Sequence, residues 1–458
     1  MTRRAFHGIV VATVAGRRAV ASQPPAPGGS DRDLLRDYAR NTWRSFEALE
    51  QPGGLPADGL SREGGAWVPT GATSPTDIAS ALWSTLAAEA LGLISRVAAA
   101  RRLGRTLTAV SLLERSQGHF LNWYDTQTAT RLASWPGGQP VRAFVSSIDN
   151  GWLAAALVMV RNARPAFRDQ ADALLGPMAF GAYYDPDAGL LRGGWWADQG
   201  APAGFHYGML NTEPRIASYL GIAGGDVPPE HYYRIPRGGA ENPVAPTRTY
   251  LGVPVSEGTR TYRGLRLVPS WDGTMFEALM VPLFVPEEVW APGSWGVNHP
   301  LYVRAQIEYG LRDAQLGVWG ISASSDPAGG YRAYGVPALG VGAVPGAPGG
   351  VVTPHASFLA LRYAPGEAMA NLRALTTAYP VYGRLGFLDA VDVAAKTVSG
   401  RVLALDQGMI LAAIANALEG DVLRHALCDG AFEAAIRPLI AAEAFDAEEG
   451  PVASRAAE

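Results

Sequence analysis

Cysteine and lysine are almost absent from this chain of 458 residues, which contains Cys428 as its single cysteine and Lys396 as its single lysine. One thiol can form neither a disulfide framework nor a thiolate metal cluster. The net charge is −4 and no run of basic residues occurs, which argues against nucleic acid as a partner. Beyond the N-terminal segment, no apolar run is long and clean enough to predict a membrane span.

The familiar catalytic motifs are also missing. The sequence contains no P-loop, no Rossmann glycine fingerprint and no G-x-S-x-G elbow, and its seven histidines are scattered without an H-x-x-x-H pair. We therefore predict no cofactor and no zinc site. The sequence leaves open a divalent ion at acidic loop residues.

The N-terminus carries a pattern typical of export. Residues 2–6, TRRAF, resemble a twin-arginine signal, and Ala19-Val20-Ala21 fits a small-x-small cleavage site. We predict a signal peptide over 1–21, a linker over 22–34 and a secreted or periplasmic protein. The alternative is an Arg-rich tail of a cytosolic protein, because Arg17-Arg18 interrupts the apolar stretch.

From residue 35 to residue 445 the chain shows repeated helical periodicity, separated by long loops rich in aromatic and polar residues. Helices are predicted over 33–49, 76–95, 101–124, 146–163, 165–178, 274–285, 301–314, 354–364, 367–379, 406–420 and near 429–445. Ser74, Thr76 and Asp77 are candidate helix caps. Short strands are predicted near 249–268 and 331–343, and the tail 446–458 is predicted to be disordered. The pattern favours an all-α toroid of helix pairs, an (α/α)6 barrel around a central cleft.

Because the familiar catalytic motifs are missing, the candidate catalytic groups are carboxylates that lie beside loop aromatics. Twelve Trp and 17 Tyr occur, many of them next to Gly or Pro, and such aromatics suit stacking on sugar rings. Glycoside cleavage needs one acid to protonate the leaving oxygen and one base to activate water. Glu213, at a loop-to-helix junction, and Asp149, at a helix start, are the candidates.

Each candidate also has a plain structural interpretation. Asp149 is equally well explained as an N-cap, and Glu213 as an acid favoured by the helix dipole. Glu277 lies in an apolar helical run, where a buried and paired carboxylate is expected. Asp326 fits an Asp-Pro turn, and Asp406 fits an N-cap.

Six blocks of the sequence, in order, resemble a known family. They are SSIDNGWLAAAL, LNTEPRIASYLGIAGGDVPPEHYYRIPR, SWDGTMFEALMVPL, GISASSDPAGGYRAYGVPALG, VVTPHASFLAL and LALDQGMILAAIANALEG. They are similar to blocks of the glucoamylase-like domain found in endo-β-1,2-glucanases of glycoside hydrolase family 144 and in cyclic β-1,2-glucan synthases. The resemblance runs from about residue 35 to 425.

The resemblance implies an (α/α)6 barrel that hydrolyses β-1,2-linked glucose chains, internally and with inversion. It implies that Glu213 is the general acid and that Asp149 occupies the second acidic position, where the glucanases often carry Glu. The Asp406-Gln407 pair is similar to the glucanase version of its block and favours a hydrolase. The residues expected to contact substrate are Trp123, Tyr124, Asp125, Trp196, Tyr207, Arg215, Trp271, Asp272, Glu277, Trp319, Asp326, Tyr331, Tyr334, Asp406 and Gln407.

Other functions remain open at this stage. One is a glycan-binding or transglycosylating protein of the same family. Another is a polysaccharide lyase on the same barrel, for which His206-Tyr207 and Arg215 could supply a base and a uronate ligand. The predicted partner is a β-glucan, and the predicted oligomeric state is a monomer. Arg215 beside Glu213 would oppose protonation of that acid unless its side chain points elsewhere.

Overall fold

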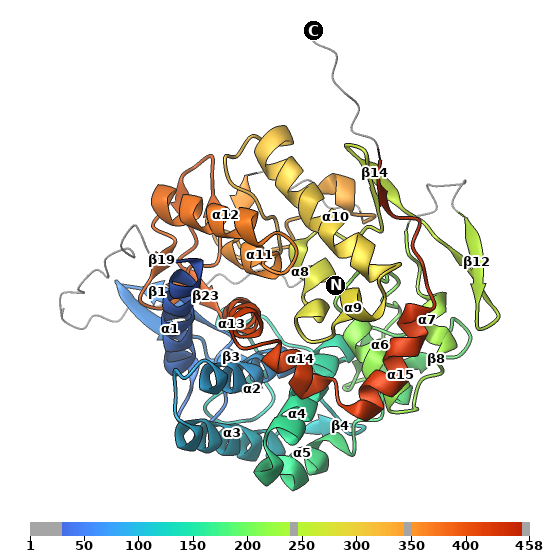
Figure 1. The fold of residues 1–458 in the computed structure, drawn as a ribbon. Helices are drawn as coiled ribbons and strands as arrows, with labels where there is room; N and C mark the ends of the chain where they lie inside the picture. Colours follow the sequence, from blue (N-terminus) through green and yellow to red (C-terminus); the bar gives the residue numbers. More distant parts are fainter. Residues whose placement is uncertain (1–29, 239–245, 343–349, 451–458) are drawn as a thin grey trace.

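The computed structural model describes residues 30–238, 246–342 and 350–450. Over these residues the fold is rich in helices, which are arranged about a common centre in Figure 1. None of the described helices combines the length and apolar character that a membrane crossing requires. The N-terminal segment in which the signal peptide is predicted lies outside the described residues.

Six helices contact one another in a closed circuit, here called the inner ring. In circuit order they are α2 (Pro75–Ala90), α4 (Ser147–Ala163), α6 (Arg215–Ala223), α8 (Met275–Leu279), α11 (Pro354–Leu359) and α13 (Ala404–Leu418), which returns to α2. Between α6 and α8 the link is Arg215, whose guanidinium donates to the backbone oxygens of Glu277 and Ala278.

Each inner helix packs against an outer helix. In the same order the outer helices are α3 (Arg96–Ser111), α5 (Arg168–Leu175), α15 (Gly430–Ala441), α10 (Trp295–Glu308), α12 (Pro365–Ala378) and α1 (Asp31–Leu49). The shorter helices are α7 (Glu230–Arg234), α9 (Glu287–Trp290) and α14 (Val422–Leu427). Two layers of helices therefore surround the centre.

The inner helices are buried on nearly all sides, and their sequences allow close packing. Every residue of α13 from Ala404 to Asn416 is buried. A Cβ atom at Gly408 would lie 2.0 Å from the Ser80 hydroxyl of α2, and one at Gly151 would lie 3.0 Å from the Cβ of Ala217 on α6. Glycine at these positions lets neighbouring helices approach closely.

Local capping fixes where several of these helices begin. Ser74 and Asp77 form a capping box at the start of α2, as predicted, and Thr274 and Glu277 form another at the start of α8. The N-cap of α4 is Ser146, whose hydroxyl accepts from the backbone N–H of Asp149. The capping role that the sequence allowed for Asp149 therefore belongs to Ser146.

The centre of the ring is filled rather than open from end to end. Trp83 of α2, Trp152 of α4 and Phe284 pack together, with ring centroids 4.9 to 6.0 Å apart. Helix α14 contacts α2, α4 and α13 just after the C-terminal end of α13. These apolar groups fill the centre of the ring.

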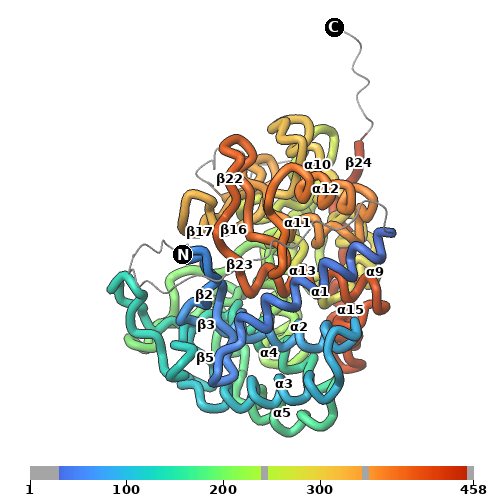
Figure 2. Tube along the Cα trace, turned by 90° about the vertical axis from the view of Figure 1, so that its left-hand side faces the viewer, coloured from blue at the N-terminus to red at the C-terminus, as the bar shows by residue number. Residues whose placement is uncertain are grey.

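Figure 2 shows the strands β2, β3, β5, β16, β17, β22 and β23 along one side of the molecule. Several directly precede inner helices: β3 (Ala72–Thr73), β7 (Phe144–Ser146), β18 (Val351–Val352) and β23 (Arg401–Leu403). The longer strands are β1 (Gly59–Glu63), β2 (Ala66–Pro69), β12 (Thr247–Tyr250), β13 (Val253–Ser256), β14 (Arg260–Tyr262), β15 (Leu265–Leu267) and β10 (Gly194–Trp196). All the pairings within these sheets are antiparallel.

The remaining strands have two residues each. They are β4 (Arg115–Ser116), β5 (His119–Phe120), β6 (Tyr124–Asp125), β8 (Tyr184–Asp185), β9 (Leu190–Leu191), β11 (Ala201–Pro202), β16 (Ser324–Ser325), β17 (Tyr331–Arg332), β19 (Tyr382–Gly383), β20 (Gly386–Phe387), β21 (Val391–Asp392), β22 (Thr397–Val398) and β24 (Glu448–Glu449).

Four boundaries differ from the sequence predictions. The helix predicted over 101–124 ends at Ser111, after which the hairpin of β4 and β5 begins. The first helix begins at Asp31, inside the segment predicted as a linker. Within the predicted disordered tail, Glu449 pairs with Leu265, so β24 belongs to a sheet. The strand predicted over 331–343 is limited to β17.

Candidate active site

The first turns of neighbouring inner helices meet at one end of the ring. The Thr76 hydroxyl of α2 donates to Asp149 Oδ1 of α4 at 2.6 Å. On the other side of α2, the Ser80 hydroxyl donates to the backbone oxygen of Ala404, the first residue of α13. Polar residues far apart in the sequence are thereby collected at the N-terminal end of the inner ring.

Two glutamates form the acidic pair of this site. Glu213 is half-buried and stands two residues before α6, and Glu277 is buried in the first turn of α8. Burial first, and then the negative charges of Glu213 and Asp272, hold the pKa of Glu277 well above its usual range. Two carboxyl groups that repel one another in this way do not both ionise readily at neutral pH.

The carboxylate of Glu277 is oriented by its own helix terminus. It accepts hydrogen bonds from the Ser270 hydroxyl at 2.7 Å and from the backbone N–H groups of Asp272 and Thr274. The sequence placed Glu277 in the middle of a helix. It lies instead at the third position of α8, because this helix begins at Met275.

Arg215 is buried next to this pair of glutamates, and its side chain is not accessible to a substrate. Its side chain and that of Glu287 are both fully buried and form an ion pair at 2.7 Å. The guanidinium also donates to the backbone oxygens of Thr212 and Ala278. The prediction that Arg215 contacts substrate is therefore wrong. Its side chain points into the core, where its charge is paired with Glu287.

Glu287 is the centre of a buried polar cluster. It accepts from Arg215, from the Tyr219 hydroxyl at 2.7 Å and from His299 Nε2 at 3.1 Å. Burial opposes ionisation of Glu287, but the charge and hydrogen bonds of Arg215 dominate together and lower its pKa to about 2. Trp295 lies against the guanidinium, 4.7 Å from ring centroid to carbon.

Asp149 is buried beside the aromatic loop that leads to Glu213. Besides the Thr76 hydrogen bond, its charge acts on Tyr183, whose pKa is raised well above its usual value mainly by burial and then by Asp149 and Tyr207. The Tyr183 ring packs against Trp195, with centroids 4.8 Å apart. Asp149 is in the first turn of α4 and Glu213 lies just before α6, and these two helices adjoin one another in the ring.

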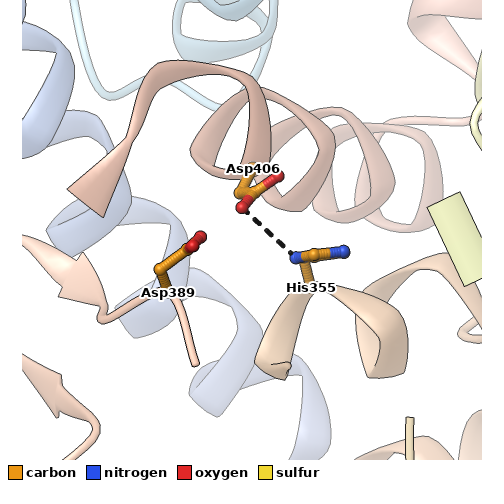
Figure 3. Close-up of side chains that lie close together, drawn as sticks. All are labelled: His355, Asp389 and Asp406. Atoms are coloured by element: carbon orange, nitrogen blue, oxygen red, sulfur yellow. Dashed lines mark ion pairs between the residues drawn. The ribbon is translucent and has the colours of Figure 1, made fainter. Parts of the chain in front are cut away.

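A second acidic group lies between α11 and α13. His355, Asp389 and Asp406 are all buried, and one ligand atom from each lies within 4.8 Å of the others (Figure 3). His355 Nδ1 is 3.5 Å from Asp406 Oδ2, as the dashed line in Figure 3 marks. Burial lowers the pKa of His355 to about 4, against the opposing charge of Asp389.

Four predicted aromatic contacts retain accessible surface. Trp271 is 50% exposed. Trp196 is half-buried with the Arg142 guanidinium 3.7 Å from its ring centroid. Trp123 is half-buried and packs edge-on against Trp135, and half-buried Tyr207 packs edge-on against Phe205.

Three predicted contacts are structural instead. Tyr124 is fully buried and donates its hydroxyl to the backbone oxygen of Glu114. Trp319 is buried, and its backbone is bound by the Asn371 side chain. Gln407 is buried and donates to the backbone oxygen of Phe387. These residues are corrections to the predicted site, because their side chains are buried in the core and have almost no accessible surface for a substrate.

The other predicted loop residues stabilise their own turns. Asp125 accepts from the backbone N–H groups of Gln127 and Thr128. Asp326 accepts from the Tyr334 hydroxyl at 2.7 Å and pairs with Arg332 at 2.6 Å. Half-buried Tyr331 belongs to β17 in the same hairpin. Asp272 is half-buried, and burial raises its pKa.

Some residues of this end were missed by the sequence analysis. His355 and Asp389 carried no motif, and Thr76 was considered only as a cap. Thr76 and His355 share one signal with the predicted residue Asp406, which is a polar side chain in the first turn of a helix that is otherwise buried. Such a group is costly to bury without a role, so this signal could have identified them.

Comparison with known proteins bears on this site. Residues 241–426 match a family model described as "Putative glucoamylase", and residues 37–183 match one described as a protein of unknown function, DUF3131. The chain is 31% identical over 315 residues to the cyclic β-(1,2)-glucan synthase NdvB of Rhizobium meliloti. That match covers 66% of this chain and 10% of NdvB, so the chain corresponds to about a tenth of this relative.

Solved structures share the fold. A glucoamylase-like protein from Bacteroides caccae, described as putative, has a TM-score of 0.70 at 19% identity, covering 89% of this chain and 99% of that one. Endo-β-1,2-glucanase from Chitinophaga pinensis has a TM-score of 0.68 at 17% identity, covering 90% and 98%. Endo-β-1,2-glucanase from Talaromyces funiculosus has a TM-score of 0.63 at 14% identity, covering 90% and 91%. The predicted similarity to the glucoamylase-like family is confirmed.

Proposed function

We propose that this chain is an exported glycoside hydrolase, an endo-β-1,2-glucanase that acts with inversion on an (α/α)6 barrel. The observation that carries the proposal is the Glu213–Glu277 pair at the end of the inner ring where Asp149 and Asp406 also lie. The similarity to NdvB and to two endo-β-1,2-glucanases supports β-1,2-glucan as the substrate. Export rests on the twin-arginine pattern of residues 2–6.

Glu213 is the proposed general acid. The repulsion between Glu213 and Glu277 favours retention of one proton by the pair at neutral pH. Glu277 is buried and held by Ser270 and by the N-terminus of its own helix, whereas Glu213 is only half-buried. Glu213 is the more accessible member of the pair, so in this proposal Glu213 delivers the shared proton to the glycosidic oxygen and Glu277 helps the pair to retain it.

Asp149 is the proposed general base. An inverting hydrolase holds its two carboxyl groups about 6.5–9.5 Å apart so that a water molecule fits between the base and the anomeric carbon. Asp149 lies on α4, the neighbour of α6 in the ring, and the Thr76 hydroxyl fixes one of its oxygens. Asp406 is the competing candidate, because in the circuit α13 is the third helix from α6 in either direction and so lies opposite Glu213.

Aromatic side chains near these acids suit a sugar chain. Trp271 precedes Asp272, whose backbone N–H binds Glu277, and Trp196 follows Trp195, which packs on Tyr183 beside Asp149. Their accessible faces can stack on glucose rings. We propose that a β-1,2-glucan binds along this end of the ring, that the chain acts as a monomer, and that cleavage is internal.

The assay is hydrolysis of linear β-1,2-glucan, with β-1,3-glucan and α-1,4-glucan for comparison, followed by reducing ends and product size. Wild type is expected to release oligosaccharides from β-1,2-glucan, and Glu213→Gln and Asp149→Asn are expected to be inactive. Glu367→Gln and Asp169→Asn are matched controls, because both acids are exposed in the first turns of outer helices. Proton NMR of the first products reports the anomer.

The outcomes separate the roles. If Asp406→Asn loses activity and Asp149→Asn retains it, the general base is Asp406 and not Asp149. Activity kept in Glu213→Gln would move the acid to Glu277. No release from any glucan by folded wild type would reject the hydrolase.

Transglycosylation is the second candidate, favoured by the similarity to a cyclic glucan synthase. Mass spectrometry of the products distinguishes it, since transfer gives longer or cyclic glucans without net reducing ends. The lyase interpretation loses support, because Arg215 is buried against Glu287 and His206 is bound to Asp185 at 2.7 Å.

A further inference from the structure

The group formed by His355, Asp389 and Asp406 has the composition of a metal site. His355 is the second residue of α11, Asp406 is the third residue of α13, and Asp389 lies in the loop between β20 and β21. The three side chains converge from these separate elements in Figure 3. Each offers one ligand atom, and these atoms all lie within 4.8 Å of one another.

Two of the three side chains have hydrogen-bonding capacity that the described residues do not use. His355 is 1% exposed, and neither of its ring nitrogens has a hydrogen-bond partner among the described residues. Asp389 is 2% exposed; its Oδ2 accepts from the backbone N–H of Ser325 at 2.5 Å, and its Oδ1 accepts no hydrogen bond in the described part of the chain. Buried imidazoles and carboxylates normally have such partners.

The charge at this point also favours a cation. Asp406 in the first turn of α13 and Asp389 in the loop between β20 and β21 bring two carboxylates close to His355 in the first turn of α11. In the described ranges Asp389 forms no ion pair with an arginine or with Lys396. Buried charges in proteins are paired with other charges or coordinate metal ions.

The donor set selects the class of ion. Calcium takes six to eight oxygen ligands, and magnesium keeps several waters and binds few protein groups. One imidazole nitrogen with two carboxylate oxygens suits zinc or manganese, and three protein ligands leave coordination positions for water.

We infer that His355, Asp389 and Asp406 bind one divalent transition-metal ion, of the zinc or manganese class, and that this ion joins the first turns of α11 and α13 to the loop that carries Asp389. The sequence predicted no metal site, because these ligands are separated by tens of residues and follow no spacing motif. The inference concerns binding and does not depend on the proposed glucanase activity.

The test is metal binding by the purified full-length chain after removal of metals with a chelator and dialysis. Titration calorimetry with zinc chloride and with manganese chloride, and elemental analysis after gel filtration, are expected to give one ion per chain. The melting temperature is expected to rise when that ion is added back. Magnesium and calcium are expected to bind at least about tenfold more weakly.

Single-ligand variants assign the ion to this site. His355→Gln and Asp389→Asn are expected to weaken binding at least about tenfold and to abolish the metal-dependent rise in melting temperature. His425→Gln is the matched control, because His425 is exposed on α14. Circular dichroism of each metal-free variant checks that it is folded.

A crystal of the wild type grown with zinc gives a measurement independent of any variant, with an anomalous peak expected between these three residues. Absence of saturable binding of either ion, or equal binding in His355→Gln, Asp389→Asn and wild type, would overturn the inference. These binding experiments contain no glucan, so their failure would reject the metal site without bearing on the proposed glucanase activity.

Discussion

Arg215 Nε lies 2.7 Å from Glu287 Oε1 in a pair of side chains that have no exposed surface. The same guanidinium holds the Thr212 carbonyl next to Glu213 and the carbonyl of Ala278 next to Glu277. One buried side chain therefore sets the relative position of the two acidic residues. We regard Arg215 as a positioning residue, because it contacts the backbone beside both acids and has no surface that a substrate could reach.

Breaking this pair is expected to destabilise the protein strongly. Glu287→Gln leaves the Arg215 charge buried without its counter-ion, which costs about 3–5 kcal/mol. Urea unfolding at pH 7 measures the loss. Glu433→Gln is the control, because Glu433 pairs with Arg437 on the exposed surface of α15, and loss of such a pair changes stability by about 1 kcal/mol or less. Similar losses in the two variants would contradict the structural role of Arg215–Glu287.

Glu277 is expected to control the pH dependence of glucan cleavage. The Glu213–Glu277 pair retains one proton up to the raised pKa, and Glu277→Gln removes the charge repulsion that retains it, so Glu213 alone loses its proton at lower pH. The basic limb of the profile of kcat/KM against pH is expected to move to lower pH in this variant. Glu367→Gln should leave both limbs of the pH profile unchanged. An unchanged basic limb in Glu277→Gln would show that Glu277 does not affect the ionisation of Glu213.

Stability should depend on pH through the same residue. The pKa of Glu277 is raised in the folded chain, so above the usual glutamate pKa the unfolded state binds fewer protons than the folded state. Stability then falls as pH rises from the usual value through the raised one. Glu277→Gln removes this contribution, so the stability of the variant relative to wild type is expected to increase across that window. Urea unfolding of both proteins at pH 4, 6 and 8 measures the trend, and a constant difference would show that Glu277 titrates normally.

The Thr76 hydroxyl is expected to orient Asp149 for catalysis. Thr76→Val keeps the shape of the side chain and removes the 2.6 Å hydrogen bond, so we expect kcat on β-1,2-glucan to fall by about fivefold, the equivalent of about 1 kcal/mol for such a bond. KM should change little. Thr85→Val, in the same helix, is the control, because Thr85 bonds only to the backbone oxygen of Ala81 in the hydrogen bonds described. Equal kcat values in both variants would argue against Asp149 as the base.

Trp271 is expected to bind the glucan without contributing to the fold. Half of its surface is exposed, so Trp271→Ala should leave the melting temperature close to that of wild type. Loss of one stacking contact of about 0.5–1.5 kcal/mol predicts a fall in kcat/KM of about twofold to tenfold. Leu112→Ala, at an exposed apolar position after α3, should have no effect. A large loss of stability in Trp271→Ala would instead indicate a packing role.

Much of the local structure could be predicted from the sequence. The capping box of Ser74 and Asp77 and the start of α4 near Ser147 depend on residues within three positions of one another. Short-range hydrogen bonds of this kind are encoded by the order of residue types. The prediction failed after Ser111, where helical periodicity continues but a hairpin forms, because β4 and β5 pair with one another and Phe120 of β5 packs into the core.

The sequence by itself determined which residue types were available for chemistry, the positions of most helices and the similarity to the glucoamylase-like family. Only the tertiary structure decided which of those residues meet. Arg215 and Glu287 are 72 positions apart, and Thr76 and Asp149 are 73 apart. Glu213 and Glu277, and likewise His355, Asp389 and Asp406, are also far apart in the sequence and come together only in the fold. Contacts at such separation depend on how the helices close into a ring, and packing of buried side chains, rather than local spacing, fixes that arrangement.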